Sequence, residues 1–441
     1  MRQSVLGILE VEGEFLFIKR QTHLNVFPGY TSFPGGKVDK KEKAIPESMS
    51  KYFSNDLHKV ASALIRELHE ELDLDVANSS VRDIKYLGKV ITPDFNPVRF
   101  ENFYFMISLS EKPKLNVDAN EIAKTFWIRP QDLMAEYSKG EHLVVPPMLL
   151  LLQTYLENPA RFPFEFKPIY DADLEVPHIY PIGPITQMLP LSHTFPPANR
   201  TNSFLIGDEK VVLVDPSPKD EQEFKKFLHT IKSRSINLVF LTHHHPDHHE
   251  FSVEIAKKLK VSMGMSEDTH QRILSKWGKD YFNGVDIEIF QCGDKLTETN
   301  GEKIFLLHTP GHDEGQLSIY SESLSWMIVS DLIQTVGTVV IGGPEGDMKK
   351  YFESLEKVIS MNPKVVIPSH GIAMGGVEKI RVTLEHRKMR ESKIKELLKD
   401  NKSEEEMLHI IYSNIDEKLF AYARKTICAH VKKIKDESNN S

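Results

Sequence analysis

One short stretch constrains this 441-residue chain more than any other, because it places several metal-binding side chains directly after a strand. An apolar run of five residues predicts a buried β-strand, and Thr-His-His-His-Pro-Asp-His follows it at 242–248. Alternation along a strand puts His243 and His245 on one side, while the proline can turn Asp247 and His248 toward a neighbouring point. The pattern predicts a fold that brings two metal ions to one strand end.

Further candidate ligands follow other apolar runs downstream. His312 ends a His-Thr-Pro-Gly-His segment, Asp331 follows a strand-like run at 326–330, and His370 follows another at 365–369. Imidazole together with carboxylate suits zinc or a similar first-row metal, and a catalytic site leaves one coordination position open for water. The sequence therefore predicts a metal centre built from these strand-end residues.

These residues, in this order, resemble the metallo-β-lactamase superfamily of dinuclear metallohydrolases. The resemblance implies an αββα sandwich with two Zn²⁺, Fe or Mn ions, in which Asp247 is also catalytic because it orients or deprotonates the attacking water. Asp215 matches the acidic residue that the family keeps near its site, where it can accept a hydrogen bond from a ligand histidine. The implied ligands are His243, His245 and His312 for one metal, Asp247, His248 and His370 for the other, and Asp331 as the bridge.

Several nearby residues are expected to have other roles. His244 and His249 are predicted to point away from the metals, His308 is predicted to brace its loop, and His386 is left open. Ser330 stands where the resembled family usually has Gly. Such departures remove no ligand, so they bear on substrate positioning rather than on metal binding.

A second cluster of candidate ligands lies nearer the start of the chain and consists of carboxylates. On a helix beginning near Val60, Glu67, Glu70 and Glu71 are related by i,i+3 and i,i+4 spacing and share one face. Clustered carboxylates suit Mg²⁺ or Mn²⁺, with water and substrate phosphates completing the shell. A Glu-rich helix alone is more often a solvated face, but a Phe-Pro-Gly-Gly turn at 33–36 favours a site here.

The turn and the helix together resemble the Nudix box. The resemblance implies an α/β/α domain that hydrolyses a diphosphate linked to a further moiety, such as a nucleoside or coenzyme A diphosphate. It makes Glu70 and Glu71 the main metal ligands, Glu67 a ligand or base, and Arg66 the residue that orients them, with Glu67 and Glu70 catalytic. Glu121 is a further candidate acid or base, or an ordinary surface residue.

Two departures from the Nudix box bear on whether this site is active. The interval between Glu42 and Arg66 is 16 residues longer than usual, which resembles the coenzyme A diphosphatase-like branch. Asp73 takes the place of the usual Gly, and Asp adopts left-handed backbone angles better than most residues do. We therefore expect the site to be retained.

Length and proline placement divide the chain. A length of 441 residues suggests roughly three domains, and nine prolines at 158–197 mark a linker. We expect a multidomain α/β protein with a Nudix-like domain at 1–165, a linker at 166–178, a metallo-β-lactamase domain at 179–376 and a small helical, winged-helix-like module at 377–441. A capping-box pattern at 403–406 predicts a helix start in that module.

Charge and cysteine content limit the classes of binding partner that this chain is expected to have. A net charge of −8 provides no global field for nucleic acid, and two distant cysteines suggest neither disulfides nor a cysteine metal site. We find no export signal and no apolar run long enough to span a membrane, so a cytoplasmic location is expected. The expected partner is a small-molecule substrate, with no membrane.

Segments at 342–348 and 385–387 are similar to the β-lactamase-like protein 2 group, which includes single-strand endoribonucleases. The predicted function is hydrolysis of an ester or thioester, such as an acyl-CoA, beside a Nudix diphosphate hydrolase. The alternative is a single-strand-specific endoribonuclease, with the Nudix-like domain as a nucleotide-binding regulatory module. Eight Lys or Arg at 379–399 could contact single-stranded RNA or could be solvated helix faces, whereas the 38 residues between Asp331 and His370 favour a small substrate. Substrate, metal identity and oligomeric state stay open.

Overall fold

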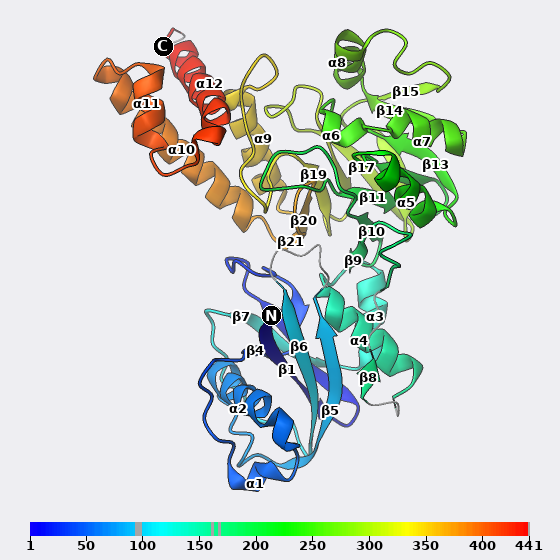
Figure 1. Ribbon diagram of the computed structural model, residues 1–441, viewed down its shortest axis with the longest axis vertical. Helices are drawn as coiled ribbons and strands as arrows, with labels where there is room; N and C mark the ends of the chain where they lie inside the picture. The colour runs from blue at the N-terminus through cyan, green and yellow to red at the C-terminus, as the bar shows by residue number, and fades with distance from the viewer. Residues whose placement is uncertain (93–98, 160–162, 166–168, 440–441) are drawn as a thin grey trace. The chain divides into compact units, whose positions relative to one another are not determined.

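The structure is a computed structural model that describes residues 1–92, 99–159, 163–165 and 169–439 (Figure 1). The chain separates into two compact units, the first of residues 1–171 with 179–183 and the second of residues 172–178 with 184–441. Within the expected linker, residues 166–168 lie outside the described part, as do the last two residues of the chain. None of the helices described combines the length and apolarity that crossing a membrane requires.

The first unit is built around one mixed sheet in the order β3-β2-β1-β6-β5-β8, with β4 paired to β1 and β7 to β2. Its helices include the 15-residue α2, which carries the candidate carboxylates. The strands are β1 (Arg2–Val11), β2 (Glu14–Arg20), β3 (Thr31–Ser32), β4 (Gly35–Lys37), β5 (Val81–Ile91), β6 (Phe100–Leu109), β7 (Ile122–Ile128) and β8 (Phe164–Glu165), and the helices are α1 (Glu47–Ser50), the 3-10 turn Asn55–Leu57, α2 (His58–Leu72), α3 (Pro130–Ser138) and α4 (Pro146–Glu157).

Alternating side chains give this sheet two apolar faces. On β6, Phe103 and Phe105 pack in one cluster with Leu64 of α2, whereas Tyr104 and Met106 belong to a second cluster with residues of α3 and α4. A strand has a period of two residues, so each face needs its own layer of helices. The predicted α/β/α arrangement is confirmed.

The second unit contains two sheets. One has the order β15-β14-β13-β12-β11-β10 and the other the order β16-β17-β18-β19-β20-β21; β9 (His178–Ile182) lies where the two units divide. The strands are β10 (Ile185–Met188), β11 (Ser203–Ile206), β12 (Val211–Val214), β13 (Ile236–Phe240), β14 (Ser262–Ser266), β15 (Ile287–Phe290), β16 (Lys295–Thr299), β17 (Glu302–His308), β18 (Leu317–Ser321), β19 (Met327–Ser330), β20 (Val365–Pro368) and β21 (Met374–Gly375).

Helices cover the outer face of each sheet in the second unit (Figure 1). Apolar residues of α5, α7 and α8 pack with β12, β13 and β14, and those of α9 and α10 pack with β17, β19 and β20. The result is the expected αββα sandwich. The helices are α5 (Glu221–Ile231), α6 (Pro246–His249), α7 (Ser252–Leu259), α8 (Glu267–Trp277), α9 (Met348–Met361) and α10 (Glu378–Lys399).

Strand direction brings the loops of this sandwich together. Strands β12, β13 and β14 run parallel, and so do β19 and β20, while β17 has the direction of β19 because both pair antiparallel with β18. The carboxyl ends of parallel strands lie at one edge of a sheet. The loops that follow β12, β13, β17, β19 and β20 carry all the candidate histidines and aspartates.

A C-terminal helical module consists of α10, whose first half also packs on the sandwich, with α11 (Glu404–Ile411), the 3-10 turn Glu417–Leu419 and α12 (Phe420–Asn439). The predicted capping box is confirmed, because Ser403 accepts from the Glu406 amide while Glu406 accepts from that of Ser403. Described residues 377–439 contain helices and turns but no strand, so the winged-helix likeness is limited to its helices.

Candidate functional site

The seven candidate ligands of the second unit lie in one cluster that is buried except at His245, whose side chain is 20% exposed. Three overlapping groups have one ligand atom per residue, all within 4.8 Å of one another. Nothing but strand-end loops and the short α6 contributes to them. The groups are His243 with His245 and His312, Asp247 with His248 and His370, and His243 with His248 and Asp331.

Two sets of atoms meet at Asp331. On one side, Nδ1 of His245 lies 3.0 Å from Nε2 of His243 and 2.9 Å from Nε2 of His312. Oδ2 of Asp331 is 3.6 Å from Nε2 of His312 and 3.3 Å from Nε2 of His370, which belongs to the other side. One carboxylate therefore faces both sets.

The local sequence explains how Asp247 and His248 join the cluster. Strand β13 ends at Phe240, and Pro246 occupies the first position of α6, where its fixed φ and missing amide hydrogen suit a helix start. The single turn of α6 then points both side chains back to the strand end. Oδ2 of Asp247 lies 3.5 Å from Nε2 of His370.

Acceptors hold the ring nitrogens that face away from the cluster. Nδ1 of His248 lies 2.9 Å from Oδ2 of Asp215, and the backbone carbonyls of Arg200 and Val340 lie 3.0 Å from Nδ1 of His370 and of His312. Such contacts fix the tautomer of a ligand histidine and leave its other nitrogen free for a metal. Asp215 has the acceptor role that the sequence suggests.

Burial and opposite charges shape the electrostatics of the cluster. Burial lowers the pKa of His243 well below its ordinary value. For His248 burial acts in the same direction, but the carboxylates of Asp215 and Asp247 outweigh it and raise the pKa well above the ordinary value. Burial would raise the pKa of Asp331, yet His370 and His248 hold it far below the usual range. A carboxylate anion thus persists at the centre.

The cluster has the donors that a metal requires. The buried atoms Nε2 of His248 and Oδ1 of Asp331 have no hydrogen-bond partner, and they lie 3.7 Å apart. Leaving buried polar atoms unpaired costs free energy, which a cation between them would recover. Imidazole and carboxylate donors fit a first-row divalent ion.

Three other histidines of the second unit belong to none of the groups of possible ligands among the described residues. His249 contacts the Tyr281 hydroxyl at 2.7 Å, and burial lowers its pKa to about 3. His308 contacts the backbone carbonyl of Glu314 at 2.6 Å and so braces its loop as expected. His386 lies exposed on α10, outside the groups of possible ligands among the described residues.

His244 lies beside two carboxylates, and together with His245 and Asp313 it forms a fourth group of possible ligand atoms. Its Nδ1 contacts Asp313 and its Nε2 lies 3.3 Å from Oε1 of Glu345. Burial opposes protonation, but both carboxylates outweigh it and raise the pKa of His244 to about 9. Glu345 was not among the predicted site residues; the Gly-Gly-Pro-Glu-Gly-Asp stretch that contains it was the available signal.

The carboxylates of the first unit are held by a single guanidinium. Arg66 donates to Glu42 at 2.9 Å, to Glu67 at 2.8 Å and to Glu70 at 2.9 Å. Arg66 reaches Glu42 despite the 16 extra residues in the interval between them. That interval folds into α1 and a 3-10 turn, and Met49 of α1 joins the core beside α2. Arg66 thus has the orienting position expected of it.

Glu71 differs from its neighbours because it is buried. It accepts the amide of Gly35 at 2.7 Å, and burial raises its pKa to about 8. Burial also raises the pKa of Glu67. A Cβ atom at Gly36 would displace the Glu67 carboxylate, and at Gly35, with φ 138°, it would collide with the Val5 backbone, so this turn requires glycine at 35. The groups of three ligand atoms found within 4.8 Å among the described residues do not include these glutamates.

Asp73 and Glu121 are two further residues of the first unit for which the sequence suggested a role. Asp73 ends α2 with φ 55° and ψ 32°, the left-handed conformation expected of the residue in place of Gly. Glu121 is exposed beside the start of β7, and its charge contributes to the raised pKa of Glu71. Its role as an acid or base stays a prediction.

Comparison with known families now decides what the two units are. The model described as Metallo-beta-lactamase superfamily matches residues 196–370, and the model described as NUDIX domain matches residues 1–146. The chain joins a NUDIX domain to a metallo-β-lactamase domain. Both domain types indicate hydrolase activity, and both families bind divalent metals.

Individual relatives of the metallo-β-lactamase domain agree. A beta-lactamase-like protein 2 homolog of Drosophila melanogaster is 24% identical over 253 residues, which are 54% of this chain and 82% of that protein. A Caenorhabditis elegans homolog with the same name is 28% identical over 211 residues, 46% of this chain and 66% of that protein. A beta-lactamase domain protein from Burkholderia ambifaria has the same fold, with a TM-score of 0.51 and 18% identity over 62% of this chain and 92% of its own.

One departure within the metallo-β-lactamase domain has a structural cost. Ser330, where the family usually has Gly, has φ 50°, a left-handed conformation that glycine adopts most easily. Its hydroxyl lies 2.8 Å from that of Thr242 and 3.3 Å from Nδ1 of His243. The serine therefore adds a contact to a ligand histidine at a position of backbone strain.

Proposed function

We propose that the metallo-β-lactamase domain is a dinuclear hydrolase of esters or thioesters, with acyl-CoA-like molecules as the substrate class. The observation that carries the proposal is the position of Asp331 between two sets of ligand atoms. Six further candidate ligands around one shared carboxylate support two metals rather than one. Zn²⁺ suits this donor set, and Fe or Mn are the alternatives.

Two metals, when bound, would supply an acidified water and positive charge for the anion that forms on the substrate. Asp247 presents its carboxylate toward the same space, where it can accept the proton of the attacking water. Thr201 directs that carboxylate through a hydrogen bond of 3.5 Å to Oδ2. The Asp247 side chain is 12% exposed whereas that of His248 is 0% exposed, so Asp247 is the more accessible of the two.

Local charge supports a small substrate over single-stranded RNA. On α10, Lys388 pairs with Glu356 at 2.7 Å, Lys395 pairs with Glu391 at 3.2 Å, and Arg387 is buried. Cations already neutralised by acidic partners release few counterions on binding phosphates, so they contribute little to RNA affinity. The 38 residues between Asp331 and His370 add no large substrate-binding insertion.

A panel of substrates tests this assignment. The full chain, loaded with Zn²⁺, should release free thiol from an acyl-CoA; Asp247→Ala should abolish the release, while Glu70→Gln should leave it unchanged. Thiol release that survives Asp247→Ala would overturn the proposal. Unstructured RNA is assayed in parallel. Cleavage of RNA that Asp247→Ala abolishes, without thiol release, would replace the substrate class by RNA.

We propose further that the NUDIX domain is a Mg²⁺- or Mn²⁺-dependent diphosphate hydrolase. Glu67, Glu70 and Glu71 would hold the metal, and Arg66 supports this role because it keeps Glu67 and Glu70 together with Glu42. Glu67 or Glu70 would accept the proton of the attacking water. A nucleoside or coenzyme A diphosphate is the substrate class.

The regulatory alternative is separable from this activity. In an Asp247→Ala background, Mg²⁺-dependent release of phosphate-containing products from coenzyme A or a nucleoside diphosphate derivative should persist and should be lost on Glu70→Gln. Binding of the same molecules without turnover would make the domain a nucleotide-binding module instead.

A further inference from the structure

The loop between β19 and α9, residues 331–347, contacts two ligand histidines of the same candidate metal. The carbonyl of Val340 lies 3.0 Å from Nδ1 of His312, and Oε2 of Glu345 lies 3.3 Å from Nε2 of His245. Both contacts are to the ring nitrogen that faces away from the ligand cluster. One loop thus borders two of the three histidines on one side of Asp331.

The position of His245 determines which of its nitrogens needs an acceptor. Its Nδ1 lies among the ligand atoms, 3.0 Å from Nε2 of His243 and 2.9 Å from Nε2 of His312. A neutral imidazole with an unprotonated Nδ1 carries its proton on Nε2. Glu345 is the carboxylate next to that proton, and its other oxygen lies 3.3 Å from Nε2 of His244.

The loop itself is held by the C-terminal helices. The buried Arg387 of α10 donates to the carbonyl of Val339, next to the residue that contacts His312. Gly342, with φ 146°, lies so close to the backbone of Lys425 in α12 that a Cβ atom would collide with it. These contacts flank Val340 on both sides, so the helical module fixes the backbone that reaches His312.

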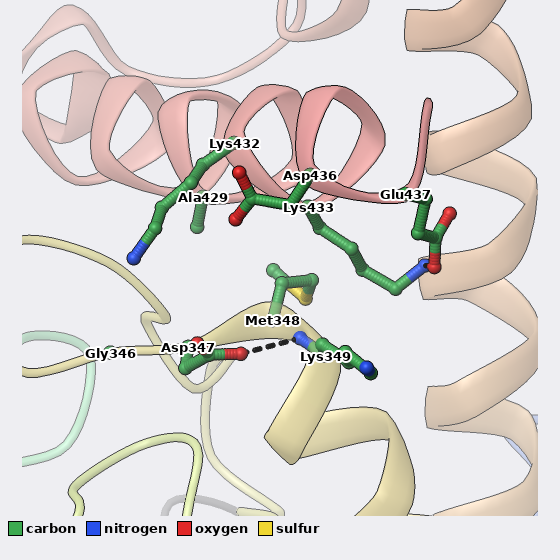
Figure 2. A pocket seen from close by; sticks show the side chains of 9 residues that line it. All are labelled: Gly346, Asp347, Met348, Lys349, Ala429, Lys432, Lys433, Asp436 and Glu437. Atoms are coloured by element: carbon green, nitrogen blue, oxygen red, sulfur yellow. Dashed lines mark hydrogen bonds and ion pairs between the residues drawn. The ribbon is translucent and has the colours of Figure 1, made fainter. Parts of the chain in front are cut away.

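The far end of the loop is also fixed. Asp347 caps α9 by accepting the amides of Lys349 at 2.9 Å and Lys350 at 3.0 Å, and its own amide donates to the carbonyl of Gly311, which precedes His312. Figure 2 shows Gly346 and Asp347 facing α12 across a cavity. This cavity has a volume of about 460 Å³, and its lining includes none of the seven candidate ligands. Glu345 therefore lies on an anchored segment.

We propose that Glu345 is a positioning residue that fixes the tautomer and direction of His245, and that the C-terminal helices hold it in place through Arg387. The proposal rests on the metal centre of the proposed function but on no particular substrate. It assigns the helical module a part in building the metal site. Loss of an outer partner of a ligand typically costs roughly 10–100-fold in metal affinity.

Cobalt binding tests the proposal without any substrate. The metal-free full chain is titrated with Co²⁺ in excess Mg²⁺, which occupies the carboxylate site, and the visible absorption of Co²⁺ reports ligand geometry. Glu345→Ala should weaken one of two equivalents by roughly 10–100-fold, with an altered spectrum. Glu345→Gln retains an acceptor oxygen and should keep most of that affinity. Arg387→Ala should weaken the same equivalent by a smaller factor.

Glu353→Ala is the matched control, because Glu353 is exposed on the neighbouring helix α9. Unchanged Co²⁺ affinity and spectrum in a folded Glu345→Ala chain would overturn the inference, and so would equal weakening of both equivalents. If Glu345→Ala does not fold, Glu345→Gln still decides the question. A loss of Co²⁺ affinity as large as that expected from replacing a metal ligand would contradict a role in fixing the tautomer of His245. Fewer than two Co²⁺ in the unaltered chain would instead refute the dinuclear centre.

Discussion

The two candidate sites of this hydrolase differ in what holds their candidate ligands together when no metal is bound. In the metallo-β-lactamase domain the ligand atoms of each group of three already lie within 4.8 Å of one another, each from the end of a strand or a single helical turn. In the NUDIX domain the carboxylates lie along one helix, and Arg66 holds Glu67 and Glu70 by ion pairs. Rigid strand ends bring mixed ligands together, whereas like charges on a helix depend on a counter-charge.

The difference has an electrostatic cause. Imidazoles and carboxylates attract or are neutral to one another, so His248 and Asp331 lie close without an ion. Three glutamates repel, and burial makes their ionisation harder still, as the raised pKa of Glu71 indicates. We infer that metal completes the geometry of the NUDIX site and occupies an existing geometry in the other.

Replacing the shared carboxylate gives the largest expected effect. Asp331→Asn removes a charged ligand common to both sets, so it should lower turnover by the metallo-β-lactamase domain by more than the roughly 10–100-fold typical of an outer partner. Metal per chain, measured by elemental analysis, should fall by up to two equivalents. The exposed Asp286→Asn of the same unit is the control. NUDIX turnover that falls together with the other activity would contradict the independence of the two sites.

The buried glutamate of the NUDIX domain offers a test with a defined sign. The pKa of Glu71 is about 8 in the folded metal-free chain and ordinarily 4.5, so between these values the folded state binds a proton that the unfolded state has released. Stability of the metal-free domain therefore falls as pH rises through this window. Glu71→Gln should raise its thermal midpoint near pH 8, with little change near pH 4.5, while turnover is lost.

Glu70→Gln serves as the comparison for this variant, because the Glu70 side chain is 58% exposed and should affect stability much less. A lower midpoint for Glu71→Gln than for the unaltered chain near pH 8 would mean that the site is not strained by its own charges.

Much of the metallo-β-lactamase site was predictable from the sequence, because its chemistry follows strand ends. Asp331 and His370 each come directly after an apolar run, and parallel pairing of β19 with β20 puts them at one edge. The layers of both domains were expected from the family resemblances rather than from the residues alone. What the sequence could not provide was the approach of segments distant along the chain.

Glu345 illustrates that limit. It lies 100 residues from His245, and its position depends on Arg387 and Lys425, which come later still. No local pattern records such a contact. The C-terminal module shows the same limit. Its capping box was predicted correctly from neighbouring residues, whereas the absence of a strand at described residues 377–439 was not predicted.

A smaller effect on stability is expected from the backbone strain at Ser330 in the metallo-β-lactamase domain. Ser330 has φ 50°, and a non-glycine residue in this conformation costs roughly 1–2 kcal/mol. Ser330→Gly and Ser330→Ala both lose the hydroxyl that contacts Thr242, but only the glycine variant relieves the backbone. Ser330→Gly should therefore be the more stable of the two by roughly 1–2 kcal/mol in thermal unfolding. Equal stability would show that the surrounding structure imposes no strain here.

The smallest expected effect concerns Glu391, whose pKa is shifted downward whereas that of Glu71 is shifted upward. Burial would raise the pKa of Glu391, but contacts with His430 and with Lys433 at 2.9 Å outweigh it and lower the pKa to about 2. Its stabilising contribution is complete above the ordinary value of 4.5 and is lost as pH falls toward 2. Glu391→Gln should lower the stability of the second unit at neutral pH and flatten its decline in acid. An acid decline as steep as that of the unaltered chain would assign it to other groups. Acidification toward pH 4.5 thus relieves the NUDIX carboxylates, while further acidification loosens the helices that hold the other site.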